Sequence, residues 1–129
     1  AEEDLMQRMM EEEASKEMRQ MKQSEVATRR QSELARTIGQ HRDMISAKVR
    51  GNTRLPDSLQ GNPEVRCLVK LLPTGEVQSV RVTQSSGNAA YDEAVVRAIE
   101  KSSPLPLPND REARDAFVPE LSLIHHPKE

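Results

Sequence analysis

The sequence is poor in the residues that usually dominate a protein core or crosslink a fold. Among its 129 residues there is no tryptophan, one tyrosine, one phenylalanine and one cysteine. Valine, leucine, isoleucine and alanine must therefore supply nearly all of a small hydrophobic core. An intramolecular disulfide is excluded because Cys67 has no second cysteine to pair with.

The sequence also lacks an excess of one charge and any long apolar run. Lysine and arginine number 19 and aspartate and glutamate 21, giving a net charge of -2. This balance argues against a nucleic-acid-binding surface and against a disordered acidic tail. No run is apolar enough for a transmembrane helix, and these residues show no signal-peptide pattern. Because Ala1 rather than a methionine begins the chain, we expect it to be part of a longer protein.

Residues 1–33 contain neither glycine nor proline, and acidic residues predominate early in this stretch and basic ones later, as suits a helix. Their apolar residues form a stripe too narrow for a core, so we expect a solvated stalk helix rather than a methionine-rich binding face. That stripe consists of Met6, Met10, Ala14, Met18 and Met21. A globular domain should follow over residues 34–129, beginning with a helical segment that packs on a sheet through Leu34, Ile38, Ile45 and Val49.

Two alternating apolar runs predict a β-hairpin. The first runs from Val65 to Leu71, and the second, carrying Val77, Val80 and Val82, follows a turn at Pro73-Thr74-Gly75. Setting the apolar sides together predicts that Val80 faces Cys67 and Val82 faces Val65, with Gly75 as the left-handed turn residue.

A capped helix and a proline-stiffened segment follow the hairpin. Gly87 permits a reversal of the backbone, and Asn88 is a good N-cap for a helix that starts near Ala89. After this helix, Pro104, Pro106 and Pro108 force extended backbone, and the leucines between them should anchor this strap to the core.

A third strand is predicted within 117–124, with Phe117, Leu121 and Leu123 on one parity. The fold class is therefore α+β, a small antiparallel three-stranded sheet packed with helices and preceded by a long N-terminal helix. The last strand most simply returns beside the first, which leaves the second and last strands as open edges. Such edges can accept an extended peptide.

The order of these motifs resembles the C-terminal domain of the TolA family over residues 40–124. The matching segments are Leu72-Pro73-Thr74-Gly75, Val80-Arg81-Val82, Ser85-Ser86-Gly87-Asn88, Tyr91-Asp92, Ala98-Ile99 and Pro104-Leu105-Pro106-Leu107-Pro108. Many TolA domains have a tryptophan before the hairpin, whereas 51–56 has none here. The related TonB C-terminal domain usually lacks the Leu-Pro-Leu-Pro exit and is the alternative.

The resemblance implies a periplasmic domain of a protein anchored in the inner membrane of Gram-negative bacteria, part of the Tol-Pal system that supports envelope integrity and cell division. The implied partner is TolB, and further candidates are Pal, colicins and the minor coat protein of filamentous phage. TolQ and TolR would be reached through an N-terminal anchor outside this sequence. The TonB-like alternative would bind outer-membrane transporters instead. No nucleic acid, small-molecule substrate or cofactor is expected.

We expect the partner to add as a strand to the last edge and thereby to transmit force from the inner to the outer membrane. The residues predicted to bind it are Val118, Glu120, Leu121, Ser122, Leu123 and Ile124, with Gln78 to Gln84 as the alternative edge.

Two chemical functions, catalysis and metal binding, are alternatives to protein binding. Cys67 could act as a nucleophile with His41, His125 or His126 as base, but a cysteine at an inward strand position is usually a small buried hydrophobe. His125 and His126 could bind a metal, yet adjacent side chains of an extended segment point to opposite sides, so we expect a solvated tail. We therefore expect no catalytic and no metal-binding residue.

Overall fold

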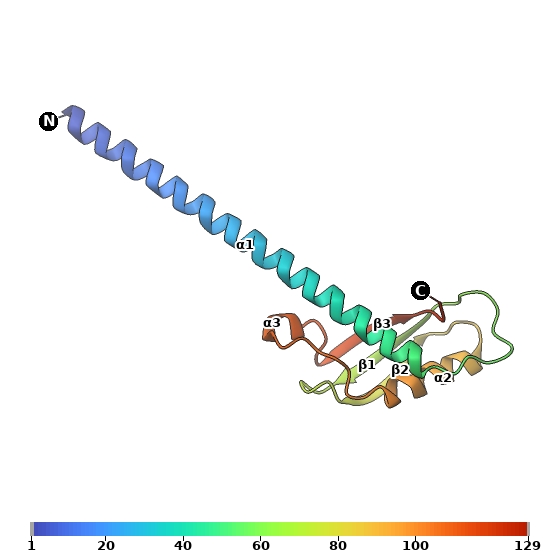
Figure 1. The fold of residues 1–129 in the computed structure, drawn as a ribbon. Coiled ribbons are helices and arrows are strands. Elements are labelled where there is room, and N and C mark those ends of the chain that lie inside the picture. The colour runs from blue at the N-terminus through green and yellow to red at the C-terminus, as the bar shows by residue number, and fades with distance from the viewer. Residues whose placement is uncertain (1, 129) are drawn as a thin grey trace. The chain divides into compact units, whose positions relative to one another are not determined.

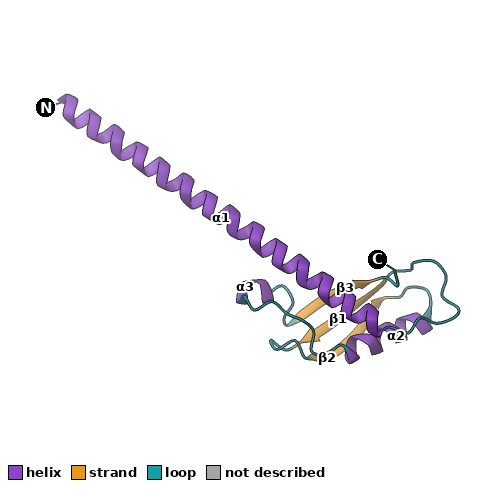
Figure 2. Cartoon of the chain, viewed as in Figure 1, coloured by secondary structure: helices purple, strands orange, loops and turns teal. Residues whose placement is uncertain are grey.

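The computed structural model describes residues 2–128. Its helices are α1 (Glu2–Asn52), α2 (Ala89–Lys101) and α3 (Arg111–Arg114), and its strands are β1 (Val65–Leu71), β2 (Val77–Gln84) and β3 (Glu120–His125) (Figures 1 and 2). The chain divides into two compact units, one ending at Ala35 and one beginning at Arg36. Within residues 2–128, the helices lack an apolar stretch that would suffice to span a bilayer.

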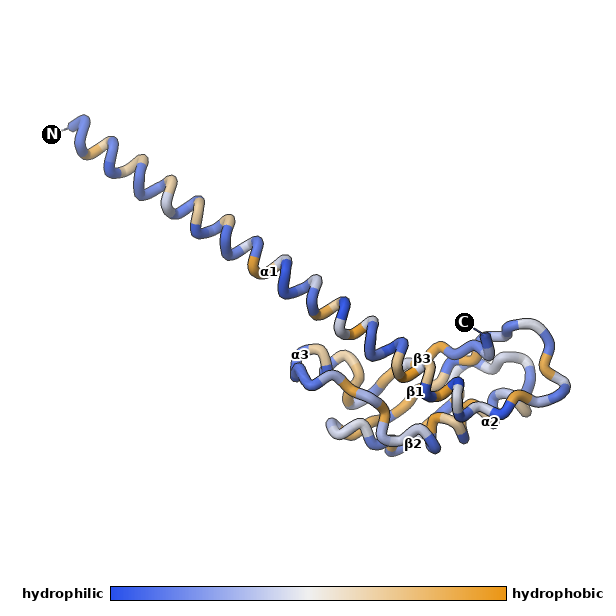
Figure 3. Tube along the Cα trace, viewed as in Figure 1, coloured by the Kyte–Doolittle hydropathy of each residue, from blue (hydrophilic) through white to orange (hydrophobic). Residues whose placement is uncertain are grey.

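Residues 2–35, in the first unit, are helical and largely exposed. The first turn carries Glu2, Glu3 and Asp4, where carboxylates interact favourably with the helix dipole. Most of the large apolar side chains here are 57–65% exposed, namely Leu5, Met6, Met9, Met10, Met18, Met21 and Val26. Figure 3 shows that hydrophilic residues predominate along this stretch. The predicted helix is confirmed, whereas its role as a solvated stalk ending at residue 33 stays a prediction.

The sheet of the second unit has β1 at its centre. β1 pairs antiparallel with β2 on one side and with β3 on the other, so the strand order is β2-β1-β3. This is the predicted arrangement, and it confirms the α+β fold class. Within the part of the chain that the structure describes, β2 and β3 each keep one edge that no further strand covers.

The core lies on one face of this sheet, under α2 and the C-terminal part of α1. Alternate residues of β1 are buried because the strand turns every second side chain toward the helices. The buried cluster contains Ile45, Val49, Val65, Cys67, Val69, Leu71, Tyr91, Val95, Ala98, Ile99, Leu105, Phe117, Leu121 and Leu123. On the opposite face, Arg66 and Lys70 are exposed. One face of the sheet is therefore open.

The predicted hairpin register is wrong by two residues, although its apolar face is right. Val82 lies opposite Cys67 rather than Val65, and Val80 lies opposite Val69 rather than Cys67. Because the shift is an even number, the same side chains still point toward the core.

The cause of this shift is the turn together with one bulge. The predicted pairing would set Leu72 opposite Gly75 and leave a loop of two residues. In the structure the Leu72 N–H donates to the Glu76 carbonyl at 2.9 Å and Gly75 adopts φ 93°, so the loop holds three residues. The longer loop alone would shift the pairing by one residue and would turn every side chain of the second strand to the opposite face of the sheet. A bulge at Gln78 shifts the pairing by one more residue and so returns the side chains to their predicted faces. Gln78 is the extra residue because Leu71 pairs with Val77 and Lys70 pairs with Ser79.

The Ser85-Ser86-Gly87 turn is held by a buried carboxylate. Both serine hydroxyls donate to Asp92, and the Ser86 N–H donates to Asp92 Oδ1 at 3.0 Å. Burial alone would raise the pKa of Asp92, but the hydrogen bonds from Ser85 and Ser86 outweigh it and hold the pKa below its usual value. The predicted cap is confirmed, because Asn88 Oδ1 accepts from the Tyr91 N–H at 3.1 Å.

The strap that follows α2 closes one end of the hairpin. Leu105 is buried, and its N–H donates to the Gly75 carbonyl at 2.8 Å. Ser103 Oγ accepts the Val77 N–H at 3.0 Å, and Lys48 Nζ donates to the Pro104 carbonyl at 2.8 Å. The strap is thus anchored to the core as predicted.

The last strand is shorter than predicted. Phe117 is buried before the strand, in the segment that follows α3, and β3 begins only at Glu120. α3 was not expected from the sequence. It is capped by Asp110, whose Oδ1 accepts the Glu112 N–H at 3.0 Å. Pro119 has no N–H to donate to the ladder, although its carbonyl accepts the Leu71 N–H at 2.9 Å.

Candidate peptide-binding edge

β3 turns every second peptide group outward, and these groups form the candidate site. The Leu71 N–H points toward β3, where the Pro119 carbonyl accepts it. Because the direction of the peptide groups alternates along a strand, the N–H and C=O groups of Val69, Cys67 and Val65 also point toward β3. Their partners are Leu121, Leu123 and His125, whose N–H groups therefore point back to β1. By the same alternation, the N–H and C=O groups of Glu120, Ser122 and Ile124 point away from the sheet. We call these three residues the β3 edge.

A groove lies beside this edge and includes one face of α1. It is lined by Asp43, Ser46, Ala47, Arg50, Ile124 and His126. The α1 residues recur at helical spacing on one side of the helix, next to the buried Ile45 and Val49. A strand paired with β3 would run along this groove, between peptide groups on one side and polar helix side chains on the other.

The structure divides the six predicted binding residues into three groups. Glu120, Ser122 and Ile124 form the β3 edge, and their side chains are exposed. Leu121 and Leu123 are buried in the core and can act only by holding the strand. Val118 precedes β3, and its N–H already donates to the Arg114 carbonyl at 3.2 Å. Its N–H is therefore not available to a partner strand, and a role of Val118 in binding stays a prediction.

The sequence analysis missed the contribution of α1. Residues 43–50 were recognised only as a segment that packs on the sheet, through Ile45 and Val49. The sequence did indicate a second face of this helix, because Asp43, Ser46, Ala47 and Arg50 recur at helical spacing beside those buried positions. What the sequence could not show is that β3, rather than β2, lies under this flank.

The alternative edge at Gln78 to Gln84 is partly closed. The outward Val77 N–H at the start of β2 is taken by Ser103 Oγ. Further along, Val82 joins α2 residues in a hollow that includes the carboxylates of Asp92, Glu93 and Glu100. A peptide added here would meet the strap at one end and charged α2 side chains of both signs, Glu93, Arg97 and Glu100, along its length. β3 therefore offers the less obstructed edge.

Comparison with known proteins identifies the family of this domain. Residues 40–119 match the family described as TonB C terminal. The chain belongs to the TonB C-terminal family. A solution NMR structure of TolAIII bound to a peptide derived from the N-terminus of TolB is similar, with a TM-score of 0.59 at 27% identity, covering 68% of this chain and 73% of that one. The resemblance to TolA and TonB C-terminal domains is thereby confirmed. Comparison with curated proteins gave no match.

TolA and TonB C-terminal domains are non-enzymatic binding domains and belong to periplasmic parts of envelope proteins. The environment of Cys67 does not favour the nucleophilic role considered from the sequence. Burial, reinforced by the nearby Asp92 charge, raises the pKa of the Cys67 thiol to about 11. A thiol with such a pKa is almost entirely protonated at neutral pH and is a poor nucleophile.

The adjacent His125 and His126 differ sharply in solvent exposure, and the burial of His125 corrects the prediction of a solvated tail. His125 is only 1% exposed at the end of β3, whereas His126 faces the groove and lies 3.5 Å from Glu64. Neither ring nitrogen of His125 has a hydrogen-bond partner among residues 2–128. Burial, together with the charges of Arg50 and His126, lowers the pKa of His125 to about 4. Within the same residues, no group of three or more His, Cys, Asp or Glu is placed to hold a metal ion.

Acid should destabilise this TonB C-terminal-family domain through His125. Between the ordinary pKa of 6.5 and the folded pKa of about 4, the unfolded chain binds a proton that the folded domain rejects. Stability should therefore be highest above pH 6.5 and should fall as the pH decreases toward 4, with His125 contributing up to about 3 kcal/mol of this loss.

Urea unfolding of the full chain at pH 7.5, 5.5 and 4.5 measures this effect. His125→Leu should flatten the dependence relative to the unmodified protein, while His126→Gln, which changes an accessible neighbour, should not. Parallel curves for the unmodified chain and His125→Leu would contradict a role for His125.

Proposed function

We propose that this chain is the partner-binding end of a TolA-type envelope protein and that it captures the N-terminal segment of TolB by strand addition at the β3 edge. The observation that carries the proposal is the uncovered row of peptide groups at Glu120, Ser122 and Ile124 beside the α1 groove. It is supported by the similarity to TolAIII, which was solved with a peptide from the N-terminus of TolB.

The edge suits a segment that is extended and disordered before it binds. Main-chain hydrogen bonds would form with β3 whatever the peptide sequence, and alternate side chains would enter the α1 groove or cover the open sheet face. Ile124 is 47% exposed and gives that face an apolar contact for the peptide. Asp43, Arg50 and His126 line the groove and would select for polar side chains.

Strand addition also suits force transfer across the periplasm. A peptide pulled along the strand direction loads several hydrogen bonds together, whereas peeling it from one end breaks them one at a time. In this function the domain couples an inner-membrane motor to the Tol-Pal system at the outer membrane, and thereby supports envelope integrity and cell division.

A TonB-type role is the second candidate, and the family match over residues 40–119 favours it. The same edge would then bind a segment of an outer-membrane transporter. The two functions differ in the partner and not in the backbone chemistry of the site.

Two peptides distinguish these functions when titrated into the ¹⁵N-labelled chain. We expect the TolB N-terminal peptide to shift the amide signals of β3 and of α1 residues 43–50, and to bind more tightly than a peptide carrying the plug segment of a TonB-dependent transporter. Preferential binding of the transporter peptide would assign the TonB-type role. Shifts confined to β2 and α2 would refute the assignment of the site to β3.

A further inference from the structure

A second hollow lies between α2 and the chain that leaves α1. It is lined by Asn52, Arg54, Ala90, Ala94, Arg97 and Lys101, all within the unit that begins at Arg36. None of these residues lines the groove beside β3. Strand addition at the β3 edge therefore gives this hollow no role.

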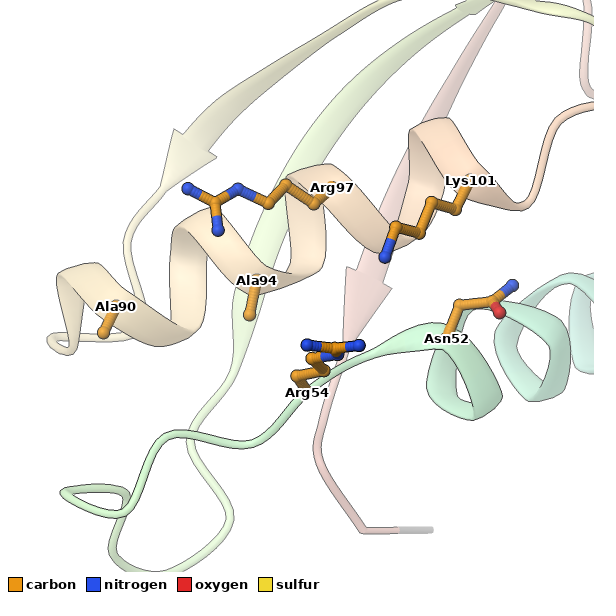
Figure 4. Close-up of a pocket in the computed structure, with 6 residues that line it drawn as sticks. All are labelled: Asn52, Arg54, Ala90, Ala94, Arg97 and Lys101. Carbon is orange, nitrogen blue, oxygen red and sulfur yellow. The ribbon is translucent and has the colours of Figure 1, made fainter.

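The shape of the hollow follows from the spacing of residues on α2. Ala90, Ala94, Arg97 and Lys101 are separated by four, three and four residues, so they share one face of the helix. Figure 4 shows the two alanines on the side of α2 that faces the Arg54 segment, Lys101 reaching toward Asn52 and Arg54, and Arg97 extending along α2 away from Arg54. Since alanine is short, α2 offers a recessed apolar floor between cationic side chains.

The charge of the hollow is of one sign. Its lining contains three cations, Arg54, Arg97 and Lys101, and no carboxylate. Arg97 forms an ion pair with Glu93 at 3.9 Å, in which the side chains are 75% and 74% exposed. Such an exposed pair holds its partners weakly, so Arg97 can turn toward another anion. Asn52 is fixed at the rim because its Nδ2 donates to Ser102 Oγ at 2.9 Å.

We propose that this hollow binds a carboxylate side chain from an acidic segment of a partner protein, as a second binding site separate from the β3 edge. The planar Arg54 guanidinium can pair with both oxygens of a carboxylate, and Lys101 can neutralise the same group from the α2 side. The alanine floor accommodates the methylene stem of a glutamate, which a free phosphate lacks. A recess also favours a side chain over a lipid surface, which needs cations that protrude from a flat face.

Short peptides of defined charge test this site on the full chain. Acetylated and amidated tetraglutamate should shift the amide signals of Ala90, Ala94 and Lys101 at low ionic strength, and tetraglutamine should not. Replacing both Arg54 and Lys101 with glutamine should weaken tetraglutamate binding at least about tenfold, since two charge-assisted contacts are lost.

A matched variant controls for the loss of net charge. Lys70→Gln with Arg81→Gln removes the same charge from the open sheet face and should leave tetraglutamate affinity unchanged within about twofold. Equal weakening by both double variants, or no weakening by either, would overturn the site. Binding to phosphatidylglycerol vesicles without binding to tetraglutamate would also overturn it, in favour of a lipid surface. Thermal unfolding of each variant verifies that the fold is retained.

Discussion

Ser122→Pro is expected to weaken binding of the TolB N-terminal peptide strongly while leaving the domain folded. The Ser122 N–H points away from β1, so its loss removes a hydrogen bond to the incoming peptide and none within the sheet. Proline is tolerated on an edge strand when its nitrogen faces outward. Together with the bulk of the ring, this change should weaken binding by about 2 kcal/mol or more, roughly 30-fold, as measured by calorimetric titration.

Three variants make this result specific. Ser122→Ala removes the hydroxyl and keeps the N–H, so its affinity should stay close to that of the unmodified chain. Val80→Pro places the same change at an outward amide of β2 and should leave TolB binding intact. Leu121→Pro removes an N–H that faces β1 and should unfold the strand itself. Normal affinity of a folded Ser122→Pro variant would exclude β3 as the binding edge.

Gly75→Ala should destabilise the domain by more than about 3 kcal/mol, a large share of the stability of a small domain. Gly75 adopts φ 93°, which an L-residue occupies only with strain. An added Cβ would also lie 2.3 Å from the Leu105 carbonyl oxygen, a backbone atom of the strap. Relief of this clash requires the hairpin turn and the strap to separate, which breaks the Leu105 N–H to Gly75 carbonyl bond.

Gly87→Ala is the matched control for backbone strain. Gly87 has a similar φ of 91°, but a Cβ there would meet no atom within 4 Å. Its cost should therefore be the conformational strain alone, about 1–2 kcal/mol. Chemical denaturation of both variants gives the difference, and equal losses of stability would show that the contact between the turn and the strap contributes little.

Local patterns predicted most of the elements of this fold. Asn88 before an apolar helical stripe determined the start of α2, and alternation from Val65 to Leu71 determined the buried face of β1. The hairpin register was predicted incorrectly, because the pattern constrains only the parity of the pairing. The choice between a two-residue loop and a three-residue loop with a bulge depends on the turn and on the strap that bonds to Gly75.

The candidate site was predicted less completely than the fold. The sequence indicated that a strand near 118–124 would form an edge, and it supplied Glu120, Ser122 and Ile124 among the proposed residues. It did not reveal that Val118 is bonded to α3 or that His125 is buried. Short elements such as α3 carry weak periodic signals, and burial at the end of a strand depends on which distant segments cover it.

The sequence by itself determined the alternating and helical apolar faces, the capped start of α2 and the stiffness of the proline segment, because each depends on residues close together in the chain. Only the tertiary structure decided which peptide groups of β3 point outward, which flank of α1 lies beside them, and where Arg54 meets α2. Those properties arise when segments far apart in sequence pack together, and no local pattern specifies that packing.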